Sequence, residues 1–128
     1  MRRKLKKIGV PLLERKNGSM VIPEKGDIVW LDFNPQSGHE QMGRRPAIVL
    51  SNNLFNQKTG MAIVCPITNT NRGFSLHVEI IGSSKVKGFI MAEQVKSVDY
   101  SARNVEIIEK VSEEVLNELL SILYACIY

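Results

Sequence analysis

Between residues 27 and 109, the apolar residues of this chain fall into short runs that turn-forming residues separate. The runs cover residues 27–33, 45–51, 61–67, 75–81, 87–92 and 105–109. Runs of this length, rich in β-branched and aromatic residues, are typical of strands. In the run 75–81 the apolar residues alternate with Ser75, His77 and Glu79, which predicts a strand with one face in solvent. The chain is therefore predicted to consist mainly of short strands.

One longer segment has the period of a helix. Ser112 is a good N-cap, and Glu113 and Glu114 follow in the first turn, where the helix dipole favours negative charge. Residues 52–60 form a turn-rich link with room for a short helix. We expect a mainly β (α+β) domain of mostly antiparallel strands, closed by one C-terminal helix. The apolar stripe of that helix comprises Val115, Leu116, Leu119, Leu120, Leu123 and Cys126.

The charge of the chain is divided unevenly along its length. Residues 1–19 hold seven Lys and Arg residues against Glu14 alone and carry +6, whereas the whole chain carries +4, which leaves −2 for residues 20–128. We predict two parts: a basic extension at 1–19, either a mobile arm or a product of start-codon choice, and one domain at 20–128. The extension is interpreted as a solvated charge run, and the alternative is a sequence-independent attraction to nucleic acid. Phosphate recognition within the domain must come from a few placed arginines.

The cysteines and the apolar runs predict a cytoplasmic protein. Cys65 and Cys126 lie far apart inside apolar segments, as expected of small core residues in a reduced protein, although a disulfide stays open. No apolar run approaches the roughly 20 residues that a membrane span needs. The basic start lacks the apolar stretch of a secretory signal.

Several classes of active site do not fit this sequence. Two Cys and two His at long, irregular spacing make no metal-ligand cluster, and we expect no metal and no other cofactor. The glycines of the 38–43 segment lack the Lys-Ser/Thr of a phosphate-binding loop, and no serine nucleophile motif occurs. Trp30 is assigned to core or interface packing rather than to base stacking. His39 and His77 are expected to be solvated side chains without a catalytic role.

What remains is a set of arginine and hydroxyl side chains next to strand ends. A glycine-bracketed loop delivers Arg44 and Arg45 to the strand at 45–51, and Pro46 favours an extended backbone at Arg45. Pro66 cannot donate a ladder hydrogen bond, so the ladder must end or bulge just before Thr68. Cleaving RNA without a metal needs proton transfer and fixed positive charge at the phosphate. These residues could supply that charge and hold a phosphate.

The order of motifs resembles the MazF/PemK family of endoribonuclease toxins from bacterial toxin–antitoxin systems. The resemblance covers residues 21–125 or so. Its motifs are PEKGDIVWLDFNP at 23–35, GHEQMGRRPA at 38–47, KTG at 58–60 with CPIT at 65–68, and AEQVKSVD at 92–99.

The resemblance implies a small SH3-like barrel of the CcdB/MazF type, assembled as a homodimer. It implies metal-independent, sequence-specific cleavage of single-stranded RNA, which leaves a 2′,3′-cyclic phosphate (or 3′-phosphate) and a 5′-hydroxyl. A cognate MazE-type antitoxin would order its disordered C-terminal segment in the RNA groove and block it. The catalytic arginine and threonine of the family fall on Arg45 and Thr68, and Glu40 matches a loop acid. The expected RNA-binding positions are Phe33, Gly38, Arg44, Arg72, Gln94 and Lys96.

Two other functions stay open at this level. One is a non-enzymatic toxin of the same fold that binds DNA gyrase, although such a protein has no need of the Arg45 and Thr68 pair. The other is a catalytically silent binding module. Neither the RNA sequence that is cut nor the identity of the antitoxin follows from the sequence.

Overall fold

Seven strands form one antiparallel sheet in the computed structural model, which describes residues 21–33, 43–83 and 85–128. The predicted extension at 1–19 and residues 34–42, which include the first half of the loop motif at 38–47, lie outside the described residues. The strands are β1 (Asp27–Phe33), β2 (Gly43–Val49), β3 (Met61–Thr68), β4 (His77–Glu79), β5 (Phe89–Met91), β6 (Lys96–Asp99) and β7 (Glu106–Lys110). The helices are α2 (Asn53–Thr59), the 3-10 turn η1 (Ala92–Gln94) and α3 (Glu113–Ile127).

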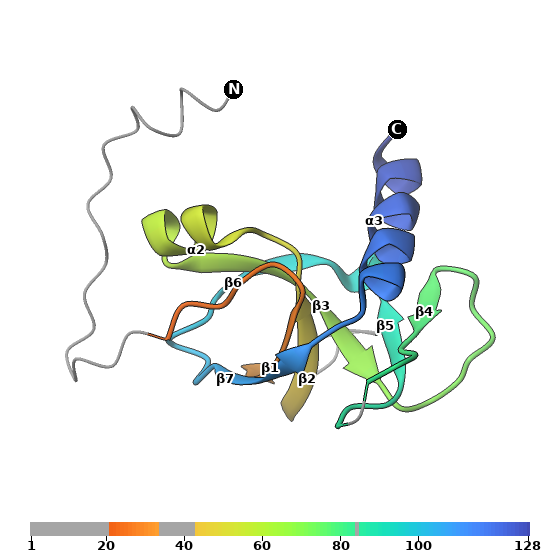
Figure 1. Cartoon of the computed structure of the whole chain (residues 1–128), viewed down its shortest axis with the longest axis horizontal. Helices are drawn as coiled ribbons and strands as arrows, with labels where there is room; N and C mark the ends of the chain where they lie inside the picture. The colour runs from red at the N-terminus through yellow and green to blue at the C-terminus, as the bar shows by residue number, and fades with distance from the viewer. Residues whose placement is uncertain (1–20, 34–42, 84) are drawn as a thin grey trace.

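The long strand β3 organises the sheet. The strand order is β4-β5-β3-β2-β1-β7, and β6 also pairs with β3. The segment β5–η1–β6 therefore runs along β3 and pairs with it at both ends, with η1 between the two pairings. Figure 1 shows the sheet curving around its own interior, with α3 standing at the β4–β5 end and α2 at the opposite end.

The apolar residues form two core clusters, one on each face of the β1–β2–β3 layer. The first contains Ile28, Ile48 and Cys65 together with Val115 and Leu119 of α3. The second fills the curved interior of the sheet and comprises Val29, Leu31, Phe33, Ala47, Val49, Ala62, Val64, Val98 and Tyr100. Alternation along each strand thus sends successive side chains into different clusters.

A buried asparagine fixes α2 to the sheet. Asn56 is completely buried, donates to the carbonyls of Pro23 (2.8 Å) and Ser51 (3.0 Å), and accepts a hydrogen bond from the Ser51 hydroxyl. The Tyr100 hydroxyl donates to the Asn56 carbonyl at 2.8 Å. Because a buried amide needs such partners, this network specifies one position for the helix.

The C-terminal helix starts where the sequence predicts. The Ser112 hydroxyl accepts from the Val115 amide at 3.3 Å, which is an N-cap. Of the predicted apolar stripe, Val115, Leu116, Leu119 and Leu123 pack in or against the first core cluster, and Leu120 does not. Both cysteines are free, and Cys126 is exposed, so the expectation of a core cysteine is wrong for Cys126. From Tyr124 onward the helix extends past the sheet, and its large apolar side chains Tyr124, Ile127 and Tyr128 are exposed. The described part of the chain contains no helix long and apolar enough to cross a membrane.

The sequence predicted six of these strands and missed β6. Five predicted runs match strands whose ends differ by a few residues, while the run at 75–81 forms a strand only at His77–Glu79. The expectation of a solvated His77 is wrong, because its side chain is only 4% exposed. Glu93 of η1 and the ring of Phe74 cover the imidazole, and both contacts come from outside its strand.

Candidate functional site

The registers of the sheet bring Arg45 and Thr68 to one place. Ala47 lies opposite Pro66 in the β2–β3 ladder, and the ladder ends there, as the proline predicts. Side chains that point the same way recur every second residue. The next such pair is therefore Arg45, two residues before Ala47 on β2, and Thr68, two residues after Pro66 on β3. Arg45 also lies opposite Leu31 of β1, so its side chain leaves the sheet on the face of the second core cluster.

Thr68 is held in a tight setting at the end of β3. The residue is 3% exposed, and its hydroxyl oxygen accepts from the Thr70 amide at 3.2 Å. That bond leaves the hydroxyl hydrogen available to a ligand. Gly88 packs directly against the Thr68 backbone, since a Cβ on Gly88 would lie 2.4 Å from the Thr68 carbonyl oxygen. The neighbouring strand segment thus fixes the position of Thr68.

Arg44 points the opposite way from Arg45 and is fully engaged in contacts with the protein. Its guanidinium donates to Asp32 (3.0 Å), Glu106 (2.9 Å) and the Asn104 carbonyl (3.0 Å). Asn104 also donates to Asp32 at 2.7 Å, and the hydrogen bonds from Asn104 and Arg44 lower the pKa of Asp32. The predicted RNA contact at Arg44 therefore competes with two ion pairs. The geometry favours a role in fixing the start of β2, and with it the adjacent Arg45.

Phe33 and Lys96 also lie at this end of the sheet interior. The Lys96 ammonium is 5.4 Å and the Arg103 guanidinium 5.9 Å from the centre of the Phe33 ring. These distances are typical of cation–π contacts. Because Phe33 is only 3% exposed, it offers no open ring to a base in this arrangement. The Phe33 ring thus contacts two cations on the face of the sheet from which Arg45 extends.

The remaining predicted RNA-binding and catalytic residues fall into two groups, those that the structure describes and those that it does not. Gln94 lies in η1, and its side-chain amide contacts the Met91 sulfur at 3.7 Å. Arg72 is exposed in the segment between β3 and β4. Gly38, His39 and Glu40 lie outside the described residues.

Two titratable side chains close to β3 are buried. Nε2 of His77 lies 3.0 Å from Glu93, while Nδ1 of His77 has no hydrogen-bond partner among the described residues. Burial, with the nearby charge of Glu93, raises the pKa of Cys65 to about 12. Cys65 is therefore a neutral core side chain and not a nucleophile. Within the described ranges, no three His, Cys, Asp or Glu side chains group closely enough to hold a metal ion.

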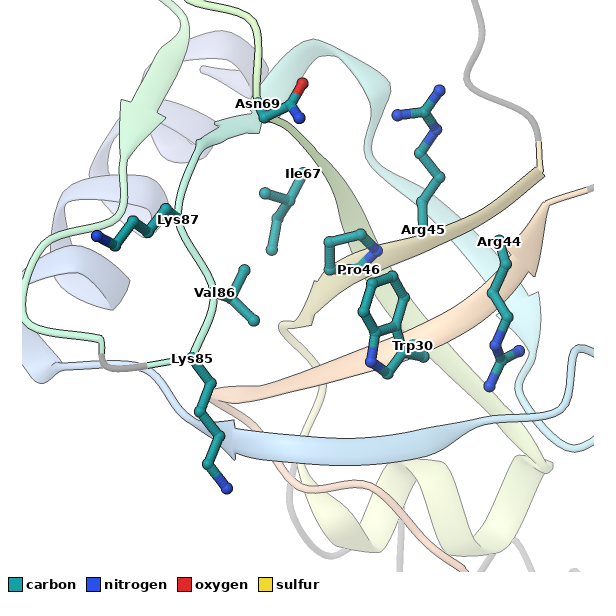
Figure 2. Close-up of a pocket in the computed structure, with 9 residues that line it drawn as sticks. All are labelled: Trp30, Arg44, Arg45, Pro46, Ile67, Asn69, Lys85, Val86 and Lys87. Carbon is teal, nitrogen blue, oxygen red and sulfur yellow. The ribbon is translucent and has the colours of Figure 1, made fainter.

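A pocket of about 320 Å³ opens beside Arg45 at the same end of β2 and β3 (Figure 2). No motif predicts this pocket, because its lining residues come from four separate segments of the chain. Trp30 is 37% exposed and lies in the pocket floor, so core packing is wrong for this residue, while interface packing stays a prediction. The lining residues are Trp30, Arg44, Arg45, Pro46, Ile67, Asn69, Lys85, Val86 and Lys87.

Comparison with known proteins finds one family over most of the chain. Residues 24–127 match the model of the PemK-like, MazF-like toxins of type II toxin–antitoxin systems. The endoribonuclease toxin ChpB of Escherichia coli K12 is 43% identical over 112 residues, which cover 81% of this chain and 93% of that protein. The endoribonuclease toxin MazF of the same strain is 42% identical over 85 residues, 66% of this chain and 76% of that protein.

Solved structures agree with the sequence relatives. A crystal structure of MazF from Deinococcus radiodurans superposes with a TM-score of 0.80 at 36% identity and covers 84% of this chain and 98% of that one. A MazE–MazF crystal structure from the same organism gives a TM-score of 0.76 at 36% identity, with 84% and 97% covered. The predicted barrel-type toxin fold is thus confirmed.

Proposed function

Because the chain belongs to the PemK-like, MazF-like family of type II toxins, we propose that it is a metal-independent endoribonuclease that cuts single-stranded RNA at a short recurring sequence. Its relatives ChpB and MazF of Escherichia coli carry the name endoribonuclease. The observation that carries the proposal is the placement of Arg45 and Thr68 at the next position of the β2–β3 register, on one face of the sheet.

The reaction proposed is an internal transesterification. The 2′-oxygen attacks the adjacent phosphorus, the bond from phosphorus to the 5′-oxygen breaks, and a 2′,3′-cyclic phosphate and a 5′-hydroxyl form. The 2′-hydroxyl loses a proton and the leaving 5′-oxygen gains one, so the step is balanced without a co-reactant. In the transition state, negative charge grows on the oxygens that do not take part in bond making or breaking.

Arg45 stabilises that charge, and Thr68 holds the phosphate. An arginine donates two parallel hydrogen bonds to a phosphate and stays charged at any physiological pH. The Thr68 hydroxyl already accepts from the Thr70 amide and so is oriented to donate. Lys96 and Arg103 add positive charge beside Phe33 on the same face. Glu40 is proposed as an acid–base group on the strength of the resemblance.

The partners proposed are a MazE-type antitoxin and a second copy of the chain. A MazE–MazF complex is known for the Deinococcus radiodurans relative. For the homodimer, the end of α3 supplies apolar surface, since Tyr124, Ile127 and Tyr128 are 67%, 73% and 89% exposed. Exposed apolar groups of this size are typical of contact surfaces. Light scattering on the purified chain measures the dimer.

The test is cleavage of a long single-stranded RNA in excess EDTA, with fragment ends mapped for 5′-hydroxyls. The wild-type chain is expected to cut at one recurring sequence. Arg45→Ala should fold and lose about 100- to 1000-fold in rate, as for removal of a transition-state donor. Arg45→Lys should stay well below wild type, because it keeps the charge but loses the paired donors. Lys58→Ala on α2 removes a cation away from the site and should cut normally.

Two results would contradict the proposal. One is wild-type cleavage by Arg45→Ala. The other is RNA that stays intact when the protein is folded and free of antitoxin. Inhibition of gyrase supercoiling would then point to the gyrase-binding toxin. Tight RNA binding without turnover would point to the silent binding module.

A further inference from the structure

The pocket beside Arg45 combines an apolar floor with a positively charged rim. Trp30 and Pro46 lie opposite each other on β1 and β2 and form the floor with Ile67 (Figure 2). The volume of about 320 Å³ is at the small end of the range for ligand sites. An exposed indole over such a floor is the kind of surface on which a planar ring stacks.

The charges of the rim are all positive. Lys85 and Lys87 are exposed, and neither side chain is ion-paired with another residue of the described part of the chain. Arg44 and Arg45 also line the pocket, and Arg44 forms ion pairs with Asp32 and Glu106. The lining contains no carboxylate. The rim therefore complements a ligand that carries phosphate groups.

A carboxylate of β7 holds the wall that carries the two lysines. Glu109 accepts hydrogen bonds from the backbone amides of Lys85 (3.0 Å) and Val86 (3.1 Å), and from the Ser83 hydroxyl. Val86, which faces the indole across the pocket, is only 7% exposed. The wall is thus preformed, which lowers the entropy cost of binding.

The pocket and the Arg45–Thr68 site share one end of the same two strands. Asn69 in the pocket lining directly follows Thr68, and Pro46 directly follows Arg45. Alternation places the two sites on opposite faces of the sheet, with Arg45 at the edge between them. A chain that passes around this edge presents a phosphate to Arg45 and Thr68 and the next base to Trp30.

From this arrangement we propose that the pocket binds an unpaired nucleobase of the RNA, next to the phosphate that is cut. The inference rests on the proposed endoribonuclease function. Trp30 stacks on the base, Asn69 hydrogen-bonds to its edge and so helps to determine the sequence that is cut, and Lys85 and Lys87 contact the following phosphates. Stacking on an aromatic side chain is sequence-tolerant, whereas an amide distinguishes bases.

The first test uses the intrinsic fluorescence of Trp30, the one tryptophan of the chain. The probe is a single-stranded DNA of about eight nucleotides, within the usual site size, which lacks the 2′-hydroxyl that the proposed cleavage needs. Binding, followed in parallel by anisotropy, should change the emission saturably. A blunt duplex should not change it, because its bases are stacked inside. Replacing both Lys85 and Lys87 by alanine should weaken binding at least several-fold, while Leu54→Ala on α2 should not.

The second test maps cleavage sites. Trp30→Ala should lose about 5- to 100-fold in kcat/KM, the range found when a stacking side chain is removed, and Asn69→Ala should change the preferred base at one position. Leu54→Ala, an exposed apolar residue outside the pocket, should leave both unchanged. Trp30→Leu serves if the alanine variant does not fold.

The outcomes separate the two proposals. Cleavage with Trp30 emission unchanged on binding overturns the pocket and leaves the nuclease standing. Emission change without cleavage of RNA supports the pocket and overturns the nuclease. If the Trp30 emission depends on protein concentration alone, the base pocket is overturned and a second copy of the chain occupies it. If the emission responds to an acidic peptide but not to the oligonucleotide, the base pocket is overturned in favour of a protein partner.

Discussion

At the scale of residues, the site depends on contacts made by side chains that never touch RNA in the proposed reaction. Asp32 accepts from Arg44 and Asn104, and Arg103 donates to the Asp32 carbonyl at 3.0 Å. These bonds join the end of β1 to the start of β2 and to the turn before β7. Removing any of them is expected to act on Arg45 through the backbone.

The Asp32 network should make stability depend on pH. The hydrogen bonds of Asn104 and Arg44 lower the pKa of Asp32 from its ordinary 3.8. The stabilisation of the fold by ionised Asp32 is therefore fully present above pH 3.8. It is lost as the pH falls through the lowered pKa. Thermal unfolding of Asp32→Asn should therefore show a lower Tm than wild type at neutral pH and a smaller difference toward about pH 3. Glu118→Gln on α3 controls for the loss of one negative charge; an equal difference at every pH would contradict the assignment.

Gly88 is expected to be irreplaceable for steric reasons. A Cβ there would lie 2.4 Å from the Thr68 carbonyl oxygen, and its φ of 137° is strained for any L side chain. Gly88→Ala should displace Thr68 and lower both the Tm and the cleavage rate. Gly73→Ala is the matched control, because Gly73 has a φ of 64° with no atom near the added Cβ. It should cost only about 1–2 kcal/mol of stability and keep the rate; equal effects of the two variants would refute the steric argument.

At the scale of elements, α3 is attached to the sheet by only part of its length. Val115 and Leu119 are buried in the first core cluster, with Leu116, Ile122 and Leu123 packed against it. Beyond Leu123 every residue of the helix is exposed. The helix up to Leu123 is thus a component of the domain core, and its exposed last turn is the surface proposed for the dimer contact.

Leu119→Ala should therefore destabilise the domain strongly. The side chain is fully buried, and truncation of a buried leucine costs about 2–5 kcal/mol through lost burial and the cavity left behind. Leu120→Ala, on the same helix but not packed on the core cluster, should cost clearly less. Denaturant unfolding measures both free energies, and a similar loss for the two variants would contradict this packing.

Much of the element order could be predicted from local pattern, and the rest depended on distant contacts. The apolar runs gave the positions of β1, β2, β3, β5 and β7, and Ser112 gave the start of α3. The strand β6 has one buried apolar residue, Val98, and is a strand because β3 lies beside it. The same holds for the site. Proline positions located Arg45 and Thr68, whereas the partners of Arg44 and the burial of His77 arise between segments far apart in sequence.

At the scale of the whole molecule, positive charge is distributed over two regions of different kinds. The domain at 20–128 carries a net −2 and places Arg44, Arg45, Lys85 and Lys87 around one pocket, while residues 1–19 carry +6. A localised site orients a phosphate, whereas a run of charge attracts nucleic acid over the Debye length without orienting it. The two contributions should therefore be separable.

A variant that begins at Met20 should bind single-stranded RNA more weakly, with a shallower dependence on salt. Each phosphate neutralised on a single strand contributes about 0.7 to the slope of log affinity against log salt concentration. The recurring cleavage sequence should stay the same, because Arg45, Thr68 and the pocket are retained. Affinities at several salt concentrations, with mapped fragments, measure both effects. A changed cleavage sequence would show that residues 1–19 take part in recognition.

The opposite orientation of Arg44 and Arg45 has a consequence for the history of this family. Arg44 forms ion pairs with Asp32 and Glu106, while Arg45 is the residue proposed to contact the phosphate that is cut. Selection should therefore act on them separately. Among relatives, position 44 is expected to covary with positions 32 and 106. Position 45 should stay arginine wherever the nuclease is retained and be lost first in descendants that have abandoned cleavage.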